Sequence, residues 1–340
     1  MKKYFTINII LLVLLSQLFV YSLAHAAETV IKLSFASFVP PGHKVNKIHE
    51  DWCKEIEKRT NGRVKVTNYP AESLLQAAWT YDGVLKGIAD IGLVNAGSTR
   101  GQFPLIEVLD LPLGSPSGSL TTKLMNAFVE KFKPKELTEV QFLYASSPGP
   151  CLIHTAKKPV NKLEDLKGLK IRCAGTFGKI ITALGGTPVS MPPPEQYDAL
   201  QKGVIDGCWT TKESLINYRI AEVTKYTTDN YGASTGAMNF YCMNKKKWDP
   251  LPDDLQKIIV QVNQEFIEIQ SKFWNGIDKE GEEFALKKGH TFIPVSKEET
   301  ARWTEKMNLV YDEFINNMKA KGLPGAEALQ YCRDYIQKNL

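Results

Sequence analysis

A short pattern in which a helix ends at a Lys-Gly pair and leads into an apolar stretch occurs twice in this chain. It reads Lys-Gly-Ile-Ala-Asp-Ile-Gly at residues 86–92 and Lys-Gly-Val-Ile-Asp-Gly at residues 202–207. Glycine is a common stop signal for a helix, and the apolar residues that follow are typical of a buried strand. Because each copy lies within its own series of strands and helices, the pattern predicts two α/β lobes.

The first series begins at the mature N-terminus. We expect strands over 30–36, 64–66 and 89–94, with helices over 43–59 and about 73–87 between them. This order is typical of a parallel sheet with right-handed crossovers. The pattern restarts after the Gly/Pro/Ser-rich region at 114–118, beginning with a helix near 119–132. Strands are then expected at 140–144, 151–155, 169–173, 188–191 and 203–209, and helices at about 177–184 and 194–202.

The last hundred residues are predicted to be largely helical. Apolar side chains recur at helical spacing over 255–288, a length that indicates one helix running across both lobes. Further helices are expected over 298–321 and 326–338, and the chain is expected to cross back between lobes near 238–240. The predicted lobes are therefore 27–150 with about 239–275, and 151–238 with about 276–340.

The first 26 residues are expected to be an export signal that is removed. Met1-Lys2-Lys3 is basic, residues 9–23 are mostly apolar, and Ala24-His25-Ala26 has the form of a cleavage site. The apolar run is also nearly long enough for an uncleaved membrane anchor. Cleavage near Ala26 places the mature protein in the periplasm, and no later apolar run reaches membrane length.

Charge and cysteine spacing exclude several functions. The chain has 42 basic and 37 acidic residues, and loss of Lys2 and Lys3 leaves 40 basic ones that are scattered along the sequence, so nucleic-acid binding has no electrostatic basis. No C-x-x-C pair occurs, which argues against a zinc ribbon or a thiol redox motif. Disulfides and buried free thiols both stay open for the six widely spaced cysteines: Cys53, Cys151, Cys173, Cys208, Cys242 and Cys332.

Several motifs of metal, nucleotide and catalytic sites are missing. The sequence has no H-E-x-x-H, EF-hand, Walker A or G-x-G-x-x-G pattern, and the stretch Gly-Ser-Pro-Ser-Gly at residues 114–118 does not match the nucleophile elbow because Pro116 occupies its centre. We therefore expect no metal, no cofactor and no enzymatic activity. An exported hydrolase whose catalytic groups come from distant positions is the alternative from another class.

One cationic residue has the position of a binding group. The sequence Leu-Glu-Asp-Leu-Lys-Gly-Leu-Lys-Ile-Arg at residues 163–172 ends a short strand on Arg172. A guanidinium at a strand end that faces a cleft matches the two oxygens of a carboxylate. The same spacing also fits a surface arginine on an edge strand, so the strand alone does not decide between them.

The chain resembles the solute receptors of tripartite ATP-independent periplasmic (TRAP) transporters, the DctP-like family, over about residues 30–338. Five ordered blocks carry the resemblance: residues 81–92, 158–172, 184–191, 197–207 and 243–252. The resemblance implies a two-lobe periplasmic binding protein of the class II-like kind, with a long helix spanning both lobes. It also implies a receptor, expected here to be a monomer, that binds an organic acid between the lobes and delivers it to small and large membrane subunits. In that family the arginine matching Arg172 forms a salt bridge with the ligand carboxylate.

Two departures from sialic-acid-type members point to the ligand. The strand at 150–154 lacks their second arginine, and Trp209-Thr210-Thr211 stands where they have an asparagine. One cation fewer and an added indole favour a monocarboxylate with an apolar or aromatic body, stacked on Trp209 or Phe38, with Thr210 contacting a hydroxyl. A receptor for a C4-dicarboxylate or a 2-oxo acid, and a protein that senses its ligand without transport, are the alternatives.

Other residues are candidates for the cleft because of their positions. Ligands of α/β proteins bind at the carboxyl ends of strands, which brings in Asn95 after the strand 89–94. Tyr81 lies on the preceding helix, Phe177 begins the helix after Arg172, and Asn239 lies where the chain crosses back. A purely structural role in loop packing or hydrogen bonding fits each of them as well.

Overall fold

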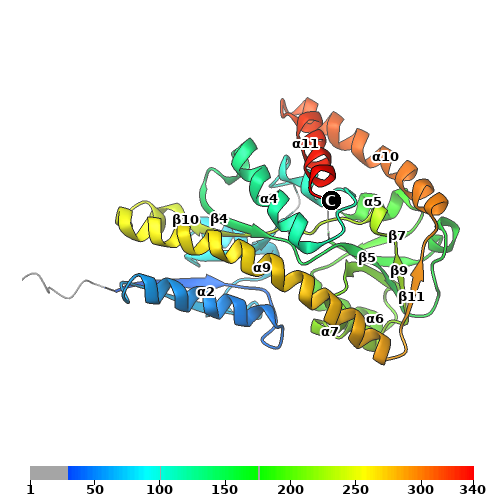
Figure 1. Cartoon of the computed structure of the whole chain (residues 1–340), viewed down its shortest axis with the longest axis horizontal. Coiled ribbons are helices and arrows are strands. Elements are labelled where there is room, and N and C mark those ends of the chain that lie inside the picture. Colours follow the sequence, from blue (N-terminus) through cyan, green and yellow to red (C-terminus); the bar gives the residue numbers. More distant parts are fainter. Residues whose placement is uncertain (1–29, 100, 175–176) are drawn as a thin grey trace, which may run out of the picture.

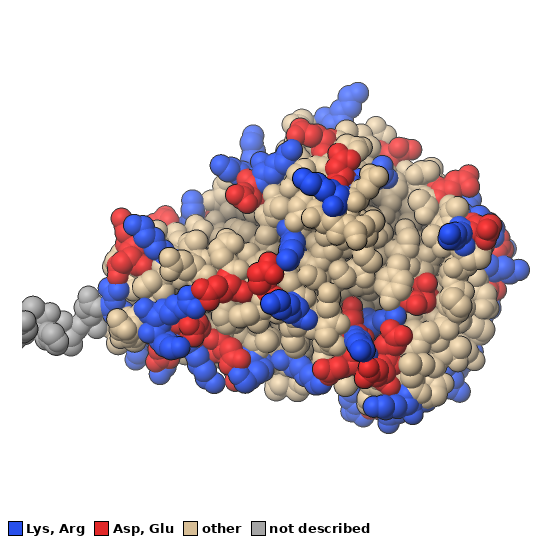
Figure 2. All heavy atoms as spheres, in the orientation of Figure 1, with Lys and Arg blue, Asp and Glu red and all other residues tan. Residues whose placement is uncertain are grey.

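The computed structural model describes residues 30–99, 101–174 and 177–340. Two mixed sheets with helices around them form two lobes, and a long helix runs along both (Figure 1). The expected export signal lies outside the described residues. On the face drawn in Figure 2, basic and acidic side chains are intermingled, in keeping with their scattered positions in the sequence.

The first lobe is built on a five-stranded sheet of order β2-β1-β3-β10-β4. Its strands are β1 (Ile31–Ala36), β2 (Val64–Tyr69), β3 (Ile91–Asn95), β4 (Val140–Ser146) and β10 (Asn239–Asn244), and its helices are α2 (Val45–Arg59), α3 (Thr80–Leu85) and α4 (Gly118–Phe132). Strands β1, β2 and β3 are parallel, whereas β10 runs antiparallel to β3 and β4. The chain thus crosses back into this sheet at Asn239, close to the predicted position.

The second lobe is built on a six-stranded sheet of order β11-β9-β5-β8-β6-β7. Its strands are β5 (Cys151–Thr155), β6 (Lys170–Cys173), β7 (Thr187–Ser190), β8 (Gly207–Thr211), β9 (Tyr226–Asp229) and β11 (Thr291–Pro294), and its short helices are α5 (Gly178–Ala183), α6 (Gln196–Gln201) and α7 (Ser214–Asn217). Strand β5 is antiparallel to β8 and β9. The predicted parallel arrangement is confirmed for β1, β2 and β3, but each sheet also contains one antiparallel strand, β10 or β5, that arrives directly from the other lobe.

Helix α9 (Asp253–Lys287) links the two lobes. It follows Leu251 and Pro252, carries Asp253 and Asp254 in its first turn, and packs against α2, α4 and β4 before it reaches α7. At 1.5 Å per residue its 35 residues extend for roughly 50 Å, enough to follow both lobes. Among the described helices, none is long and apolar enough to cross a membrane.

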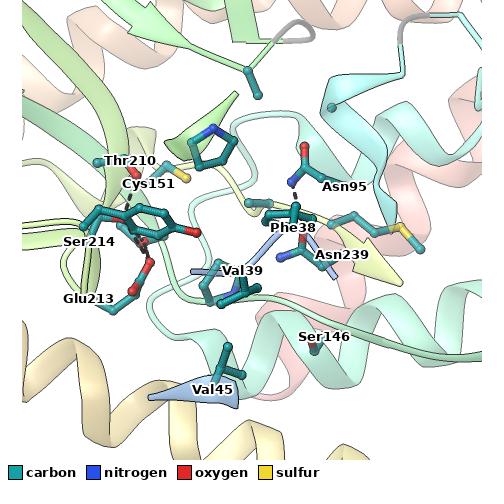
Figure 3. A pocket seen from close by; sticks show the side chains of 18 of the residues that line it. Phe38, Val39, Val45, Asn95, Ser146, Cys151, Thr210, Glu213, Ser214 and Asn239 are labelled. Atoms are coloured by element: carbon teal, nitrogen blue, oxygen red, sulfur yellow. Dashed lines mark hydrogen bonds between the residues drawn. The ribbon is translucent and has the colours of Figure 1, made fainter. Parts of the chain in front are cut away.

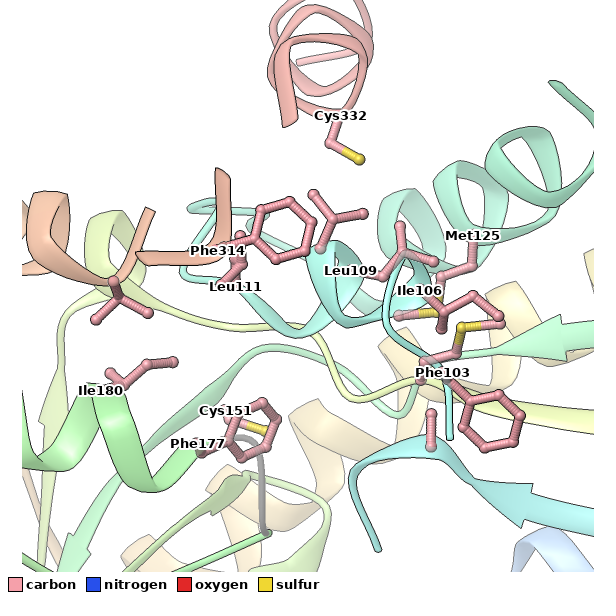
Figure 4. Close-up of a cluster of buried hydrophobic side chains, with 14 of the residues drawn as sticks. Phe103, Ile106, Leu109, Leu111, Met125, Cys151, Phe177, Ile180, Phe314 and Cys332 are labelled. Carbon is pink, nitrogen blue, oxygen red and sulfur yellow. The ribbon is translucent and has the colours of Figure 1, made fainter. Parts of the chain in front are cut away.

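The C-terminal helices α10 (Lys297–Ala320) and α11 (Gly325–Lys338) cover the junction from the other side. Helix α10 packs on α5 and α11 packs on α4, so the pair contacts both lobes. Figure 4 shows Phe314 and Cys332 of these helices beside Leu109 and Leu111 in the buried cluster that continues to Phe177. All six cysteines are buried and free, which resolves the open choice in favour of thiols.

Candidate ligand-binding site

A cavity of about 70 Å³ lies between the lobes, at the ends of strands from both sheets. One ordered water needs only about 10–15 Å³ of such space, so the cavity accommodates a small organic molecule. Phe38, Asn95 and Asn239 reach it from the first lobe, and Arg172, Phe177, Trp209 and Thr210 reach it from the second. Seven of the eight residues predicted from the sequence therefore lie together.

Tyr81 is the predicted residue that does not line the cavity. Its hydroxyl donates to the carbonyl oxygen of Glu136 at 2.7 Å, and its ring packs edge-on against Phe103 and Phe240. The side chain is buried in the core of the first lobe. The sequence placed Tyr81 on the correct helix, the one before β3. That helix turns the Tyr81 side chain toward the core of the first lobe and not toward the cavity.

Arg172 is held in a fixed orientation at the cavity wall. Its Nε and Nη2 atoms donate to the carbonyl of Met191 at 3.1 and 2.8 Å, and Nη1 donates to Oε1 of Gln196 at 3.4 Å. A guanidinium has five N–H donors. Counted over the described residues, these three bonds leave one N–H on each terminal nitrogen, and two such N–H groups can bind a carboxylate in bidentate fashion.

The charge of Arg172 is poorly compensated by its surroundings. The side chain is 3% exposed, and burial lowers the pKa of its guanidinium from the usual value. No ion pair joins it to a carboxylate in the part of the chain that the structure describes. Since a buried charge without a partner costs several kcal/mol, roughly 3–5, an anion at this position is strongly favoured.

Aromatic side chains form the apolar part of the cavity. Phe38, Phe177 and Trp209 are each at least 95% buried and line it from different loops and strands. The indole N–H of Trp209 donates to Oγ1 of Thr235 at 2.8 Å. This bond fixes the ring, so Trp209 serves the core of its lobe and the cavity wall at once.

Asn95 and Asn239 form an amide pair on the side of the first lobe. Nδ2 of Asn95 donates to Oδ1 of Asn239 at 2.9 Å, and the hydroxyl of Ser98 donates to Oδ1 of Asn95 at 2.8 Å. Figure 3 shows this pair on one side of the cavity and Thr210, Ser214 and Glu213 on the other. The arrangement orients the amide of Asn239, whose Nδ2 group has no hydrogen-bond partner within the described residues.

Glu213 and His43 are site residues that the sequence analysis did not predict. Oε2 of Glu213 lies 3.0 Å from Nε2 of His43, and both side chains are buried on the cavity wall. Nδ1 of His43 accepts the N–H of Val45, so Nε2 carries the hydrogen that is donated to Glu213. Burial raises the pKa of Glu213, but His43 and the donors Asn217 and Ser214 outweigh it and hold that pKa below its usual value. Glu213 is thus an anion.

A positional signal for Glu213 was present in the sequence. The residue lies two positions after the last residue of β8, and the ends of such strands are where ligand sites form in α/β folds. His43 has no comparable local signal, because its contact with Glu213 arises only when the lobes meet. Tyr218 also lines the cavity and was not predicted; its hydroxyl has no hydrogen bond to any described residue.

Metal ligation has no support from the described residues, which contain no group of three or more His, Cys, Asp or Glu side chains placed to hold an ion. The chemistry that the cavity offers is therefore that of one buried cation, an aromatic wall, and amide and hydroxyl groups. Such a set of groups is chemically suited to a small molecule with a carboxylate.

Comparisons with known proteins agree with this fold. The family model described as bacterial extracellular solute-binding protein, family 7 (DctP) matches residues 35–317. A TRAP periplasmic solute-binding protein from Desulfovibrio salexigens is 34% identical, with a TM-score of 0.81 over 91% of this chain and 96% of that one. A marine metagenome TRAP protein described as specific for aromatic acid ligands is 29% identical, with a TM-score of 0.86 over 91% and 99%.

A curated relative from Rhodobacter capsulatus, a C4-dicarboxylate-binding periplasmic protein, is 28% identical over 318 residues, which are 89% of this chain and 91% of the relative. The family model covers well over half of the chain, and both solved structures share its two-lobe architecture. The chain therefore belongs to the DctP family of bacterial extracellular solute-binding proteins, the receptors of TRAP transporters.

Proposed function

We propose that this receptor binds a monocarboxylic acid with an apolar or aromatic body, and that Arg172 holds its carboxylate in a bidentate salt bridge. The single observation that carries the proposal is the buried guanidinium with two unused N–H groups and no carboxylate partner among the described residues. A ligand carboxylate supplies both the missing charge and the missing acceptors. Such a pair strengthens as closure of the lobes excludes water.

The remainder of the cavity favours an apolar body over a second carboxylate. Arg172 is the only permanent cation among the described lining residues, whereas Glu213 and Asp110 are acidic. A second carboxylate lacks a cation to pair with and is repelled by Glu213. The rings of Phe38, Phe177 and Trp209 instead offer surfaces on which an aromatic acid packs.

A C4-dicarboxylate or 2-oxo acid is the second candidate. It is favoured by the R. capsulatus relative, whose own name states that it binds C4-dicarboxylates. The metagenome protein, described as specific for aromatic acids, has the higher structural similarity of those compared above and supports the first candidate. In either case we infer export with cleavage near Ala26, action as a monomer, and delivery of the acid to TRAP membrane subunits.

A thermal-shift panel tests the proposal. The mature protein is heated with benzoate, phenylacetate, succinate or pyruvate at equal concentrations. Binding to the folded state alone at 100 times the dissociation constant stabilises it by about 2.7 kcal/mol, which is a clear rise in melting temperature. We expect the aromatic monocarboxylates to give the larger shifts. Large shifts with succinate alone would establish the dicarboxylate alternative.

A further inference from the structure

A chain of hydrogen bonds leads from the cavity wall to the carboxylate of Glu213. The hydroxyls of Thr210 and Ser214 are 2.9 Å apart, and Ser214 donates to Oε1 of Glu213 at 2.9 Å. Thr211 donates to the same oxygen at 3.0 Å. All four side chains are at least 93% buried and line the cavity. Figure 3 shows three of them, Thr210, Glu213 and Ser214, close together.

Counting hydrogens fixes the direction of this chain. The Glu213 carboxylate is ionised and can only accept, and each hydroxyl has one hydrogen to donate. Ser214 gives its hydrogen to Glu213, so its oxygen must accept in the bond with Thr210. Thr210 therefore gives its only hydrogen to Ser214. Thr210 therefore presents only the two lone pairs of its oxygen, which are acceptor sites, to the cavity. Hydrogen bonds in a series that ends on a charge also polarise one another.

The position of Thr210 relative to Arg172 suits one small ligand. Arg172 pairs with Cys208 in the parallel register of β6 and β8. Thr210 is two residues further along β8, which puts it on the same face of the sheet about 7 Å along the strand. Because both residues also line the cavity, a ligand whose carboxylate binds Arg172 shares that cavity with the Thr210 hydroxyl.

We propose that Thr210, held as an acceptor by Ser214 and Glu213, selects acids that carry a hydroxyl group as well as the carboxylate. This inference rests on the proposed function and specifies the class of acid. A ligand hydroxyl can donate to Thr210 without breaking the hydrogen bonds that join Thr210, Ser214 and Glu213. A group that can only accept, such as a second carboxylate or an ether, faces lone pairs there unless Thr210 breaks its bond to Ser214.

Pairs of acids that differ by one hydroxyl test the proposal: mandelate against phenylacetate, and 3-hydroxybenzoate against benzoate. Isothermal titration of the mature wild-type protein is expected to show at least one hydroxylated acid binding about tenfold or more tightly than its partner, the value of one good hydrogen bond. In Thr210→Val, which keeps the shape and loses the hydroxyl, the ratio should fall to near one through loss of affinity for the hydroxylated acid.

Three further variants separate selectivity from folding. Thr210→Ser keeps a hydroxyl and should retain the preference, and Thr182→Val removes an exposed threonine of α5 outside the cavity and should leave it unchanged. Ser214→Ala frees the hydrogen of Thr210, so the preference should shrink and 3-methoxybenzoate, an acceptor at the same ring position, should gain affinity.

Each outcome bears on one proposal or on both. Equal binding of the hydroxylated and unsubstituted acids, or a preference that persists in Thr210→Val, overturns the selective role of Thr210 while the acid receptor stands. Binding of no acid of either kind overturns the proposed function, and the inference about Thr210 with it.

Discussion

Nε2 of His43 lies 3.0 Å from Oε2 of Glu213, and this contact joins the two lobes at the wall of the cavity. His43 lies between β1 and α2 of the first lobe, and Glu213 lies between β8 and α7 of the second. Both are buried, and His43 also packs edge-on against Tyr218 of the second lobe with ring centroids 5.3 Å apart. The packing of the two lobes therefore includes a buried polar contact that a separation of the lobes at this point must break.

Glu213→Gln should weaken ligand binding by disturbing this contact. In the variant, an amide NH2 group replaces one carboxylate oxygen and faces a group that donates to that oxygen, either His43 or Ser214. Two donors cannot bond to each other, and a buried group left without a partner costs about 2–5 kcal/mol. We expect a fall in affinity for the bound acid and a smaller compaction on ligand addition, measured by titration and small-angle scattering. Glu280→Gln is the matched control: it removes an exposed ion pair with Lys44, which should matter little.

The stabilising effect of Glu213 should depend on pH in the acidic range. The pKa of Glu213 in the folded protein is below the ordinary value of 4.5, because His43, Asn217 and Ser214 outweigh the opposing effect of burial. A lowered pKa contributes stability that is complete above that ordinary value and is lost as pH falls through the folded one. Denaturant unfolding of wild type and Glu213→Gln should therefore converge below pH 4.5. A difference in unfolding free energy that grows toward low pH contradicts this.

Asp278→Asn should stabilise the protein at neutral pH. Desolvation, followed by the nearby charge of Glu213, raises the pKa of Asp278 well above 3.8. For a carboxylate with a raised pKa, stability is complete below the unfolded value and is lost as pH rises through the folded one. Asparagine avoids that loss and its Oδ1 can still accept the N–H of Glu213, which now bonds Asp278 at 2.9 Å.

The variant should accordingly melt at a higher temperature than wild type at pH 7, and the difference should vanish below about pH 4. Asp254→Asn serves as the control on the same helix. The bond from Arg63 lowers the pKa of Asp254, the opposite direction, so no gain is expected there. A lower melting temperature for Asp278→Asn at pH 7 would show that its charge is stabilising.

Two glycines of α9 should respond in opposite ways to alanine. A Cβ at Gly281 would lie 2.1 Å from the backbone oxygen of Lys212, next to Glu213, whereas a Cβ at Gly276 meets nothing within 4 Å. Gly276→Ala should raise the unfolding free energy by roughly 0.5–1 kcal/mol through helix propensity. Gly281→Ala should lower it by about 1–3 kcal/mol through overpacking and should weaken ligand binding as well. Denaturant titration measures both, and equal stabilisation by the two changes contradicts the close packing of α9 here.

The sequence predicted the features that rest on local patterns. The long helix was placed at 255–288 and is found at Asp253–Lys287, because apolar spacing over many turns is a strong signal. Arg172 was assigned through the family blocks, and the structure puts it on the cavity wall. Its role in holding the ligand stays a prediction.

The remainder of the site depends on contacts between distant segments. No local pattern links His43 to Glu213, since their contact exists only when the lobes pack together. The antiparallel direction of β5 and β10 was not predicted for a related reason: a strand's alternation does not reveal whether it arrives from its own lobe or from the other one. Tyr81 was placed in the correct helix, but the face that it occupies is set by packing on Phe103 and Phe240.

The most direct test of the account is the affinity of Arg172 variants for the acid that binds wild type best. Arg172→Lys keeps the charge but loses the planar pair of donors, and Arg172→Ala loses both. Isothermal titration at pH 7 should show weaker binding by Arg172→Lys and a loss of about a hundredfold or more for Arg172→Ala, since breaking a buried charge pair costs about 3–5 kcal/mol. Unchanged affinity in Arg172→Ala, with the fold intact, would contradict the central role of this residue.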